Sequence, residues 1–331
     1  MSLVRAERRR FLKRRLIKWL LVIAVALFAI IAAAIFLNNE KVSPQRIAAA
    51  EAQAQRNYED SVVQWHTEHD LRCKSVTEGT PEADMCAQDM EPQREWFTPD
   101  LPSTFIFKKD FSPLITVWAA LLAVIAFVIG ASFVGAEWST GSMMTLLTWR
   151  PRRIQVLSTK LAVLAGWLTA ISAVSLALWT GAFWLTAQLR GSTDGMTSGT
   201  WQSLGLTGLR GLGLVLAVGI VGFLLATLGR HTGVALGVAL GVIIVGQVGL
   251  GIVLGLLQVP FLEAYLLPSH LMAWMDKQYI VQNWSVDCTG PGPCLPETRT
   301  LTWEGTGSIA LAAALVLAVV AFWQIKRRDI A

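Results

Sequence analysis

Six long hydrophobic runs, separated by polar and charged connections, dominate the pattern along the chain. About 20 helical residues cross a hydrocarbon core of about 30 Å, and each run is close to or above that length. The third and fifth runs exceed one crossing, so we expect them to be tilted, broken or extended beyond the lipid. The runs are Trp19 to Leu37, Phe111 to Gly135, Leu161 to Leu189, Gly211 to Gly229, Thr232 to Leu262 and Gly305 to Ile325.

This pattern predicts an all-α, polytopic membrane protein with six transmembrane helices. The first run follows a basic N-terminus, as in a secretory signal peptide, but it is longer than the apolar region of about 7–15 residues in such signals. We therefore expect a retained first span. The predicted parts are a basic interfacial segment (1–18), the first span (19–37), a large loop domain (38–110), the second span (111–135), a short polar connection (136–160), the third to fifth spans (161–258), a re-entrant, disulfide-stapled loop (259–304), and the sixth span with a basic tail (305–331).

Composition and charge add an orientation. Hydrophobic residues make up 53% of the chain and charged residues 15%, against roughly 25% charged residues in soluble domains. The N-terminus, the 136–160 connection, Arg230 and the C-terminal tail hold 16 of the 28 basic residues and 3 of the 23 acidic ones. Because positively charged loops are retained inside, both termini are predicted to be cytoplasmic, with an extracytoplasmic helical insertion between the first two spans. The basic excess therefore indicates contact with membrane lipid rather than with nucleic acid.

The cysteines support this orientation. Cys73 and Cys86 lie in one predicted outer loop, and Cys288 and Cys294 lie in the other. Disulfides persist in oxidising compartments. Of the three possible pairings, Cys73 with Cys86 and Cys288 with Cys294 is the simplest.

Helical signals extend beyond the spans. The basic segment 4–18 contains Phe11, Leu12 and Leu16, which favours a helix in the headgroup plane; a disordered tail is the alternative. In the first outer loop, Ser43 followed by a proline suggests a helix cap. An apolar stripe of three- and four-residue spacing follows. We expect a helix over residues 44–74, and irregular structure from Thr80 to Pro102.

The fifth run contains regularly spaced glycines and two strongly polar side chains. Gly229, Gly233, Gly237 and Gly241 repeat every four residues, which allows close helix packing in lipid; flexibility is the alternative. Gln247 and Gln258 are its strongly polar side chains, and each is expected to form an interhelical hydrogen bond or to line a substrate pathway. The outer connection after this run is aromatic and amphipathic in its first half, which favours short helices.

Several chemistries are missing from the sequence. No run has an interior Asp, Glu, Lys or Arg, which disfavours ion-coupled transport. The chain lacks a zinc-protease motif, a nucleophile elbow and a phosphate-binding loop, so we expect neither an enzyme nor a bound cofactor. His66 and His69 with Cys73 could bind a metal, but a disulfide at Cys73 is the simpler reading, and no metal site is predicted.

The stretch from Gly135 to Arg153 lies at the predicted inner membrane face. It combines a carboxylate, a Gly-Ser step, an apolar patch and several arginines. We interpret it as the end of a span, an interfacial helix and a turn, whereas an ordinary positively charged loop would explain only the arginines. Methionine-rich patches suit a surface that repacks against a moving partner. The apolar patch consists of Met143, Met144, Leu146, Leu147 and Trp149.

These residues resemble the type-2 permease family of ABC transporters. Members carry, between their second and third spans, a glutamate, a Gly-Thr or Gly-Ser step, a Leu-Leu pair, a proline with an arginine, and a lysine that opens the next span. Here Ser142 replaces the more common threonine, and Pro151 lies slightly late. By position, the resemblance implies an ATPase-coupling role for Glu137, Gly141, Ser142, Leu146, Leu147, Arg150, Pro151, Arg153 and Lys160.

The resemblance implies a permease subunit of the bacterial plasma membrane. Such a subunit pairs with a second, identical or different permease and docks two ATPase subunits, which bind ATP and Mg. Most relatives export drugs, peptides, antibiotics or lipid-like molecules. Two other classes remain as alternatives: a membrane-anchored interaction or sensor protein that works through the 38–110 domain, and an intramembrane enzyme, for which no catalytic constellation is recognisable.

Overall fold

The computed structural model describes residues 3–74, 86, 89–149, 152–283 and 295–327. Within these residues, six helical segments are long and apolar enough to cross a membrane, which confirms the predicted fold class. They are α2 (Arg15–Asn38), α5 (Phe107–Ser139), α7 (Arg153–Arg190), α8 (Ser198–Gly229), a segment over Thr232–Leu256, and α12 (Trp303–Arg327).

The two longest hydrophobic runs behave differently. At 1.5 Å per residue, the 38 residues of α7 extend for about 57 Å, well beyond a hydrocarbon core of about 30 Å. The fifth run is instead one helical segment over Thr232–Leu256 with a π-helical turn inside it. It consists of α9 (Thr232–Ile243), the π-helical turn (Ile244–Gly249) and α10 (Leu250–Leu256). One run is therefore longer than a single crossing, and the other is locally widened by the π-helical turn.

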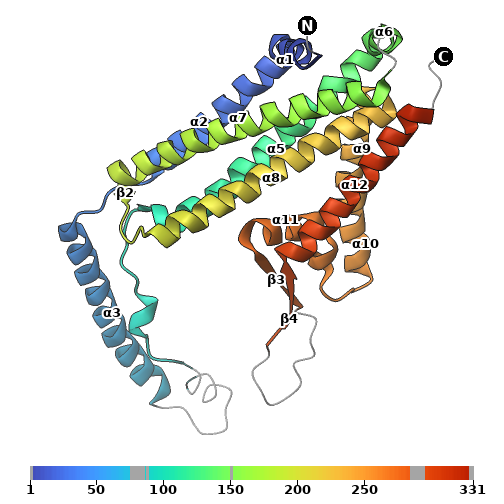
Figure 1. The fold of residues 1–331 in the computed structure, drawn as a ribbon. Helices are drawn as coiled ribbons and strands as arrows, with labels where there is room; N and C mark the ends of the chain where they lie inside the picture. The colour runs from blue at the N-terminus through green and yellow to red at the C-terminus, as the bar shows by residue number, and fades with distance from the viewer. Residues whose placement is uncertain (1–2, 75–85, 87–88, 150–151, 284–294, 328–331) are drawn as a thin grey trace. The chain divides into compact units, whose positions relative to one another are not determined.

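The chain forms two compact units. The larger comprises residues 1–32, 108–183 and 195–331, and the smaller comprises residues 33–107 and 184–194. In the larger unit, α5 lies between α7 and α8 (Figure 1). Two tryptophans of this unit bridge α5 and α7: Trp118 Nε1 donates to Ser175 Oγ at 3.1 Å, and Trp179 Nε1 donates to the Leu114 carbonyl at 3.1 Å.

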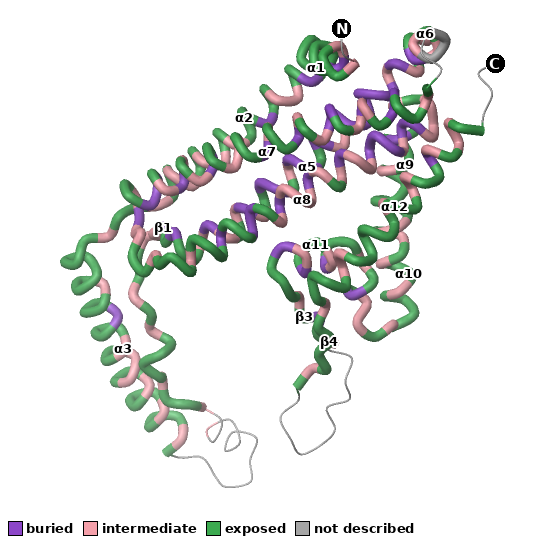
Figure 2. Tube along the Cα trace, viewed as in Figure 1, coloured by how far each residue is buried: buried purple, intermediate pink, exposed green. Residues whose placement is uncertain are grey.

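Glycines bring α5 and α8 into backbone contact. A Cβ on Gly130 would overlap the carbonyl oxygen of Gly219, and a Cβ on Gly222 would overlap the carbonyl oxygen of Phe127. Figure 2 shows many buried positions along these two helices and none along α10. The core of the larger unit therefore lies around α5 and α8. These glycines are not the ones that the four-residue repeat singled out.

The connection after α10 holds helices and a hairpin. A 3₁₀ turn (Leu262–Tyr265) precedes α11 (Leu267–Asp276), as the amphipathic pattern predicted. The antiparallel strands β3 (Gln278–Asn283) and β4 (Glu297–Thr302) were not predicted. Their β-branched residues, including three threonines in β4, favour strands. Trp274 of α11 donates its Nε1 hydrogen to the Arg210 carbonyl at 3.0 Å, which ties this connection to α8.

The smaller unit is built on α3 (Pro44–Cys73). Ser43 caps α3 by accepting from the Arg46 N–H at 3.3 Å, so the predicted helix and its cap are confirmed. The predicted disulfide between Cys73 and Cys86 is present, whereas Cys288 and Cys294 lie outside the described residues.

A short 3₁₀ turn and a pair of strands complete the smaller unit. The 3₁₀ turn spans Arg94–Trp96, and the described residues 89–93 and 97–104 are irregular, as the sequence predicted for this region. Strands β1 (Phe105–Ile106) and β2 (Gly191–Ser192) pair in parallel. Their pairing joins the loop before α5 to the end of α7 within this unit.

Candidate functional site

The basic N-terminal segment forms a separate helix, α1 (Leu3–Lys13), so the helical interpretation holds rather than the disordered tail. Its Phe11 is buried and lies between two aromatic rings. The Phe11 ring is stacked on Trp167 of α7 with a centroid distance of 5.8 Å, and it meets Phe133 of α5 edge-on at 5.4 Å. Arg14 is the single non-helical residue between α1 and α2. The first helix is thus anchored in the core of the larger unit.

Four charged side chains converge beside this anchor. Lys160 Nζ, at the start of α7, lies 2.5 Å from Glu7 Oε2 and 2.7 Å from Glu137 Oε2. Arg14 lies 2.7 Å from Glu137 Oε1 and also donates to the Ser132 carbonyl at 2.6 Å. The Lys160 contact with Glu137 is an ion pair by distance without hydrogen-bond geometry. We call Glu7, Arg14, Glu137 and Lys160 the ion cluster.

Three charged groups of the ion cluster are buried, so each of these costs free energy unless it is paired. Glu7 and Lys160 are fully buried, and Glu137 is 6% exposed. Within the ion cluster two carboxylates face two cations, and Arg10 adds a third cation from the rim, 3.0 Å from Glu7 Oε1. The Phe133 ring faces Arg14 and Lys160 at 5.2 Å from its centroid. Removing one partner of a buried ion pair typically costs about 3–5 kcal/mol, because the remaining charge is left unpaired. The ion cluster therefore holds α1, α5 and α7 together.

The Gly-Ser step reverses the chain directly after Glu137. Gly141 has a φ of +68°, a left-handed conformation that glycine adopts without steric cost. The Ser142 hydroxyl donates back to the Glu137 carbonyl at 3.2 Å, which satisfies one of the open carbonyls at the end of α5. These two residues allow α6 (Ser142–Trp149) to follow α5 immediately.

One side of α6 packs into the larger unit. Met143 is buried against Val156 of α7, and Trp138 and Leu146 pack partly against the same pair. The expected apolar surface of this helix is therefore partly internal, because Met143 is 1% exposed. Thr145 lies on the exposed side of α6. The side chain of Leu147, and residues Arg150 and Pro151, lie outside the described parts of the chain.

The basic segments meet at one end of the larger unit. Arg153, the first residue of α7, donates to the Ile325 carbonyl near the end of α12 at 3.3 Å. Arg230, in the left-handed turn between α8 and α9, lies over the ring of Trp138 at 5.0 Å. Figure 1 shows the N-terminus, α6 and the end of α12 at this end. The charge count had assigned the same segments to one side of the membrane.

A cleft of about 760 Å³ opens beside the ion cluster. Its single acidic lining residue is Glu137, which is already paired with Arg14 and Lys160. The cleft is therefore strongly cationic. Its lining residues are Arg9, Arg10, Lys13, Arg14, Arg15, Leu16, Ser132, Ala136, Glu137, Thr140 and Ser142.

The predicted residues of the fifth span lie away from the ion cluster. A Cβ on Gly229 or Gly233 would meet Val234 or His231 of the adjacent turn, whereas Gly237 and Gly241 have no described atom of this chain within 4 Å of such a Cβ. Within the described part of the chain, no helix packs closely against Gly237 or Gly241 in the way that the prediction for this stripe had expected.

The two glutamines have different surroundings. Gln247 lies in the π-helical turn, and its Oε1 accepts the Leu267 N–H at 2.6 Å, so it forms a hydrogen bond between helical segments. Gln258 has a φ of +51° and lines a cavity of about 390 Å³ with Glu263 and Gln282. Gln258 therefore lines a cavity, as expected of a residue beside a substrate pathway.

Sequence reasoning missed two of the four residues of the ion cluster, Glu7 and Arg14. Glu7 is the only acidic residue in the first eighteen, and an isolated carboxylate among eight cations could have signalled a buried partner. Elsewhere, His66 Nε2 lies 3.3 Å from Glu91 Oε1. Among the described residues, no group of three or more potential ligands is placed to hold a metal ion.

Comparison with known proteins identifies the family. No protein with a curated description matches the chain. A family model described as ABC-2 family transporter protein matches residues 4–330, nearly the whole chain. The match includes all four residues of the ion cluster, α6 and the six membrane-spanning segments. The chain belongs to this family, and it is a multi-pass membrane permease subunit of an ABC transporter rather than its ATPase.

Proposed function

We propose that this permease is driven by two separate ATPase subunits and exports a drug, peptide, antibiotic or lipid-like molecule. The observation that carries the proposal is the ion cluster directly beside α6. Through it, any force on the segment from Glu137 to Lys160 reaches three helices at once. ATP and Mg bind to the partner subunits, and this chain supplies the moving membrane part.

The contacts suggest how the force is transmitted. The partner ATPase pushes on the exposed side of α6, whose other side is packed through Met143 on Val156 of α7. Separating Glu137 from Lys160 would take away one of the two cations that face this buried carboxylate, which is costly. The ends of α5 and α7 therefore move together with α1 as one body, and the remainder of each span tilts.

The cationic cleft identifies a complementary surface. Five basic side chains line it, and its single carboxylate is already paired. A partner that docks here gains most from acidic side chains, because opposite charges across an interface raise the association rate and suppress wrong partners. We assign this cleft and α6 to the ATPase contact, at the cytoplasmic face.

The fifth span provides the surface for a second permease. Only Ala235 is buried among residues Thr232–Leu256, and Gly237 and Gly241 leave the backbone open to close approach. Two permeases that meet near this segment would enclose an apolar path between them. Gln258, at the end of the segment, is placed beside such a path.

The coupling assignment is tested on α6 by co-purification. Thr145→Arg places a bulky cation on the exposed side of α6, and Thr298→Arg makes the same change on exposed β4. We expect Thr145→Arg to reduce co-purified ATPase activity and ATP-driven transport at least about tenfold, equal to about 1.4 kcal/mol. Thr298→Arg should leave both unchanged.

A triple variant, Leu146→Ala with Leu147→Ala and Arg153→Gln, should act like Thr145→Arg. Unchanged ATPase binding and transport in both variants of this segment would refute the coupling role.

The orientation is tested by labelling. Thr145 in α6 and Gln53 in α3 are both exposed, so a cysteine introduced at either position is open to a reagent on its side of the membrane. A membrane-impermeant thiol reagent applied to intact cells should label the Gln53→Cys variant above the unsubstituted background, and Thr145→Cys only after the membrane is opened. Labelling of Thr145→Cys from outside would place α6 beyond the reach of any cytoplasmic ATPase.

A further inference from the structure

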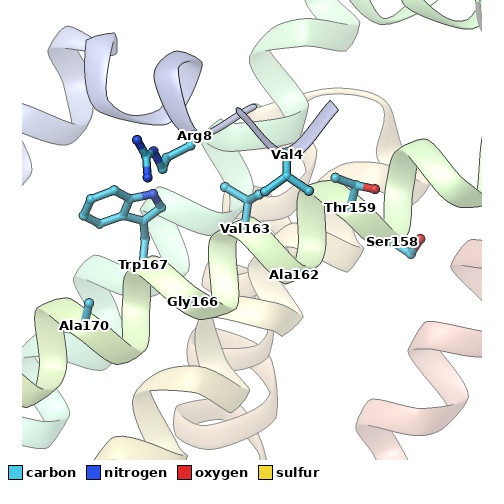
Figure 3. A pocket seen from close by; sticks show the side chains of 9 residues that line it. All are labelled: Val4, Arg8, Ser158, Thr159, Ala162, Val163, Gly166, Trp167 and Ala170. Atoms are coloured by element: carbon cyan, nitrogen blue, oxygen red, sulfur yellow. The ribbon is translucent and has the colours of Figure 1, made fainter. Parts of the chain in front are cut away.

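A groove of about 640 Å³ lies between α1 and α7, outside the ion cluster (Figure 3). Its walls come from Val4 and Arg8 of α1 and from one face of α7. The α7 residues that line it are Ser158, Thr159, Ala162, Val163, Gly166, Trp167 and Ala170.

Small residues keep the floor of this groove open. Ala162, Gly166 and Ala170 recur every four residues along α7, so they share one face of the helix. A Cβ on Gly166 would meet no described atom within 4 Å. The same spacing continues to Val174 and Leu178, which are 61% and 71% exposed. An apolar track therefore leads from the groove along the outside of α7.

The groove is positive beside Trp167, next to the part of the floor where this track leaves it. Arg8 lies beside the Trp167 indole (Figure 3). Its neighbour Glu7 is occupied by Lys160 and Arg10, and within the described part of the chain Arg8 makes no ion pair. The hydroxyls of Ser158 and Thr159 border the other end of the groove (Figure 3). A ligand that matches this groove has an anionic head and a long apolar tail.

We propose that the groove binds one anionic phospholipid, with its phosphate at Arg8 and an acyl chain that runs from Gly166 and Ala170 along α7 toward Leu178. At 1.5 Å per residue, the track from Trp167 to Leu178 is about 16 Å long. That length is about half of a hydrocarbon core of about 30 Å, so it accommodates the acyl chain of one leaflet. A free phosphate ion would leave the apolar face uncovered. The proposal is independent of ATPase coupling.

Native mass spectrometry of the full chain in detergent tests this site. The lipids are dioleoyl phosphatidylglycerol, which is anionic, and dioleoyl phosphatidylcholine, which is zwitterionic. The unsubstituted chain should bind one phosphatidylglycerol in preference to phosphatidylcholine. Arg8→Gln should weaken phosphatidylglycerol binding about fivefold, as expected for one basic residue near an anionic surface. Gly166→Leu fills the groove and should abolish that preferred binding.

The matched control is Gly181→Leu, the same change on the same helix, where a Cβ also meets no described atom; binding should be unchanged. If Gly166→Leu does not give monodisperse protein, Ala170→Leu narrows the same groove and should also abolish the binding. Excess glycerol phosphate should not displace the lipid. The proposal is overturned if either groove-filling variant binds phosphatidylglycerol as the control does, if the unsubstituted chain binds both lipids equally, or if glycerol phosphate displaces the lipid.

Discussion

The second and fifth spans are both strongly apolar, but they have opposite surroundings. In α5, 56% of the most apolar stretch is buried inside the chain, whereas none of the corresponding stretch of the fifth span is buried. Hydrophobicity therefore does not distinguish an interior helix from an outward-facing one, because both environments are apolar. What distinguishes them is specific contact: small residues that admit a neighbouring backbone, and polar groups that find partners.

Glycine illustrates the difference. Gly130 of α5 allows direct contact with the backbone of α8, whereas a Cβ on Gly237 of α9 has no described atom of this chain within 4 Å. The same residue type serves internal packing at one position and leaves a surface uncovered at the other. Four substitutions test this comparison.

The largest effect is expected where α5 ends at the ion cluster. Lys160→Met leaves Glu7 and Glu137 buried without their shared cation, and should lower the free energy of unfolding by about 3–5 kcal/mol. Denaturant titration in detergent measures this. Lys326→Met, at an exposed lysine of α12, is the control and should have little effect. The double variant Lys160→Met with Glu7→Gln should regain part of the unfolding free energy lost in Lys160→Met alone. If the losses of the two single variants simply add in the double variant, Glu7 and Lys160 are not coupled.

The next effect is expected in the α5 and α8 contact. Gly130→Ala forces a methyl group into the backbone of Gly219, and overpacking of this kind costs about 1–3 kcal/mol. Thermal unfolding of the detergent-solubilised chain should show a lower midpoint. An unchanged midpoint would mean that α5 and α8 are not in close contact.

A smaller effect is expected at the π-helical turn of the fifth span. Gln247→Leu removes the acceptor for the Leu267 N–H, and should lower the free energy of unfolding by about 1 kcal/mol. Hydrogen exchange at the start of α11 should rise. Unaltered exchange at Leu267 would contradict the role of this hydrogen bond in positioning α11.

The smallest effect is expected at Gly237→Ala, the counterpart of Gly130→Ala. Because a Cβ there meets no described atom, the unfolding free energy of the monomer should change by less than about 0.5 kcal/mol. If a second permease packs on this face, cross-linked dimer in membranes should decrease. A destabilised monomer would instead indicate an internal contact.

The six spans and the helix after Ser43 were predictable because each depends on local sequence: the length of an apolar run, or a cap followed by a stripe. The disulfide between Cys73 and Cys86 was predictable from compartment and spacing. Glu137 and Lys160 were singled out by resemblance, but the pairing of Lys160 with Glu7 was not predictable, because it joins residues 153 positions apart. The π-helical turn and the β3–β4 hairpin were not predicted for a related reason. Their backbone conformation depends on contacts with neighbouring segments such as α11.

The pairing of Glu7 has a consequence for biosynthesis. The partner of Glu7, Lys160, is synthesised 153 residues after it. At a synthesis rate of about 5–20 residues per second, α1 waits for about 8–30 s before Lys160 and the Trp167 ring that covers Phe11 exist. During that interval α1 depends on the membrane surface or on a chaperone, and it becomes fixed only after the start of α7 has been made.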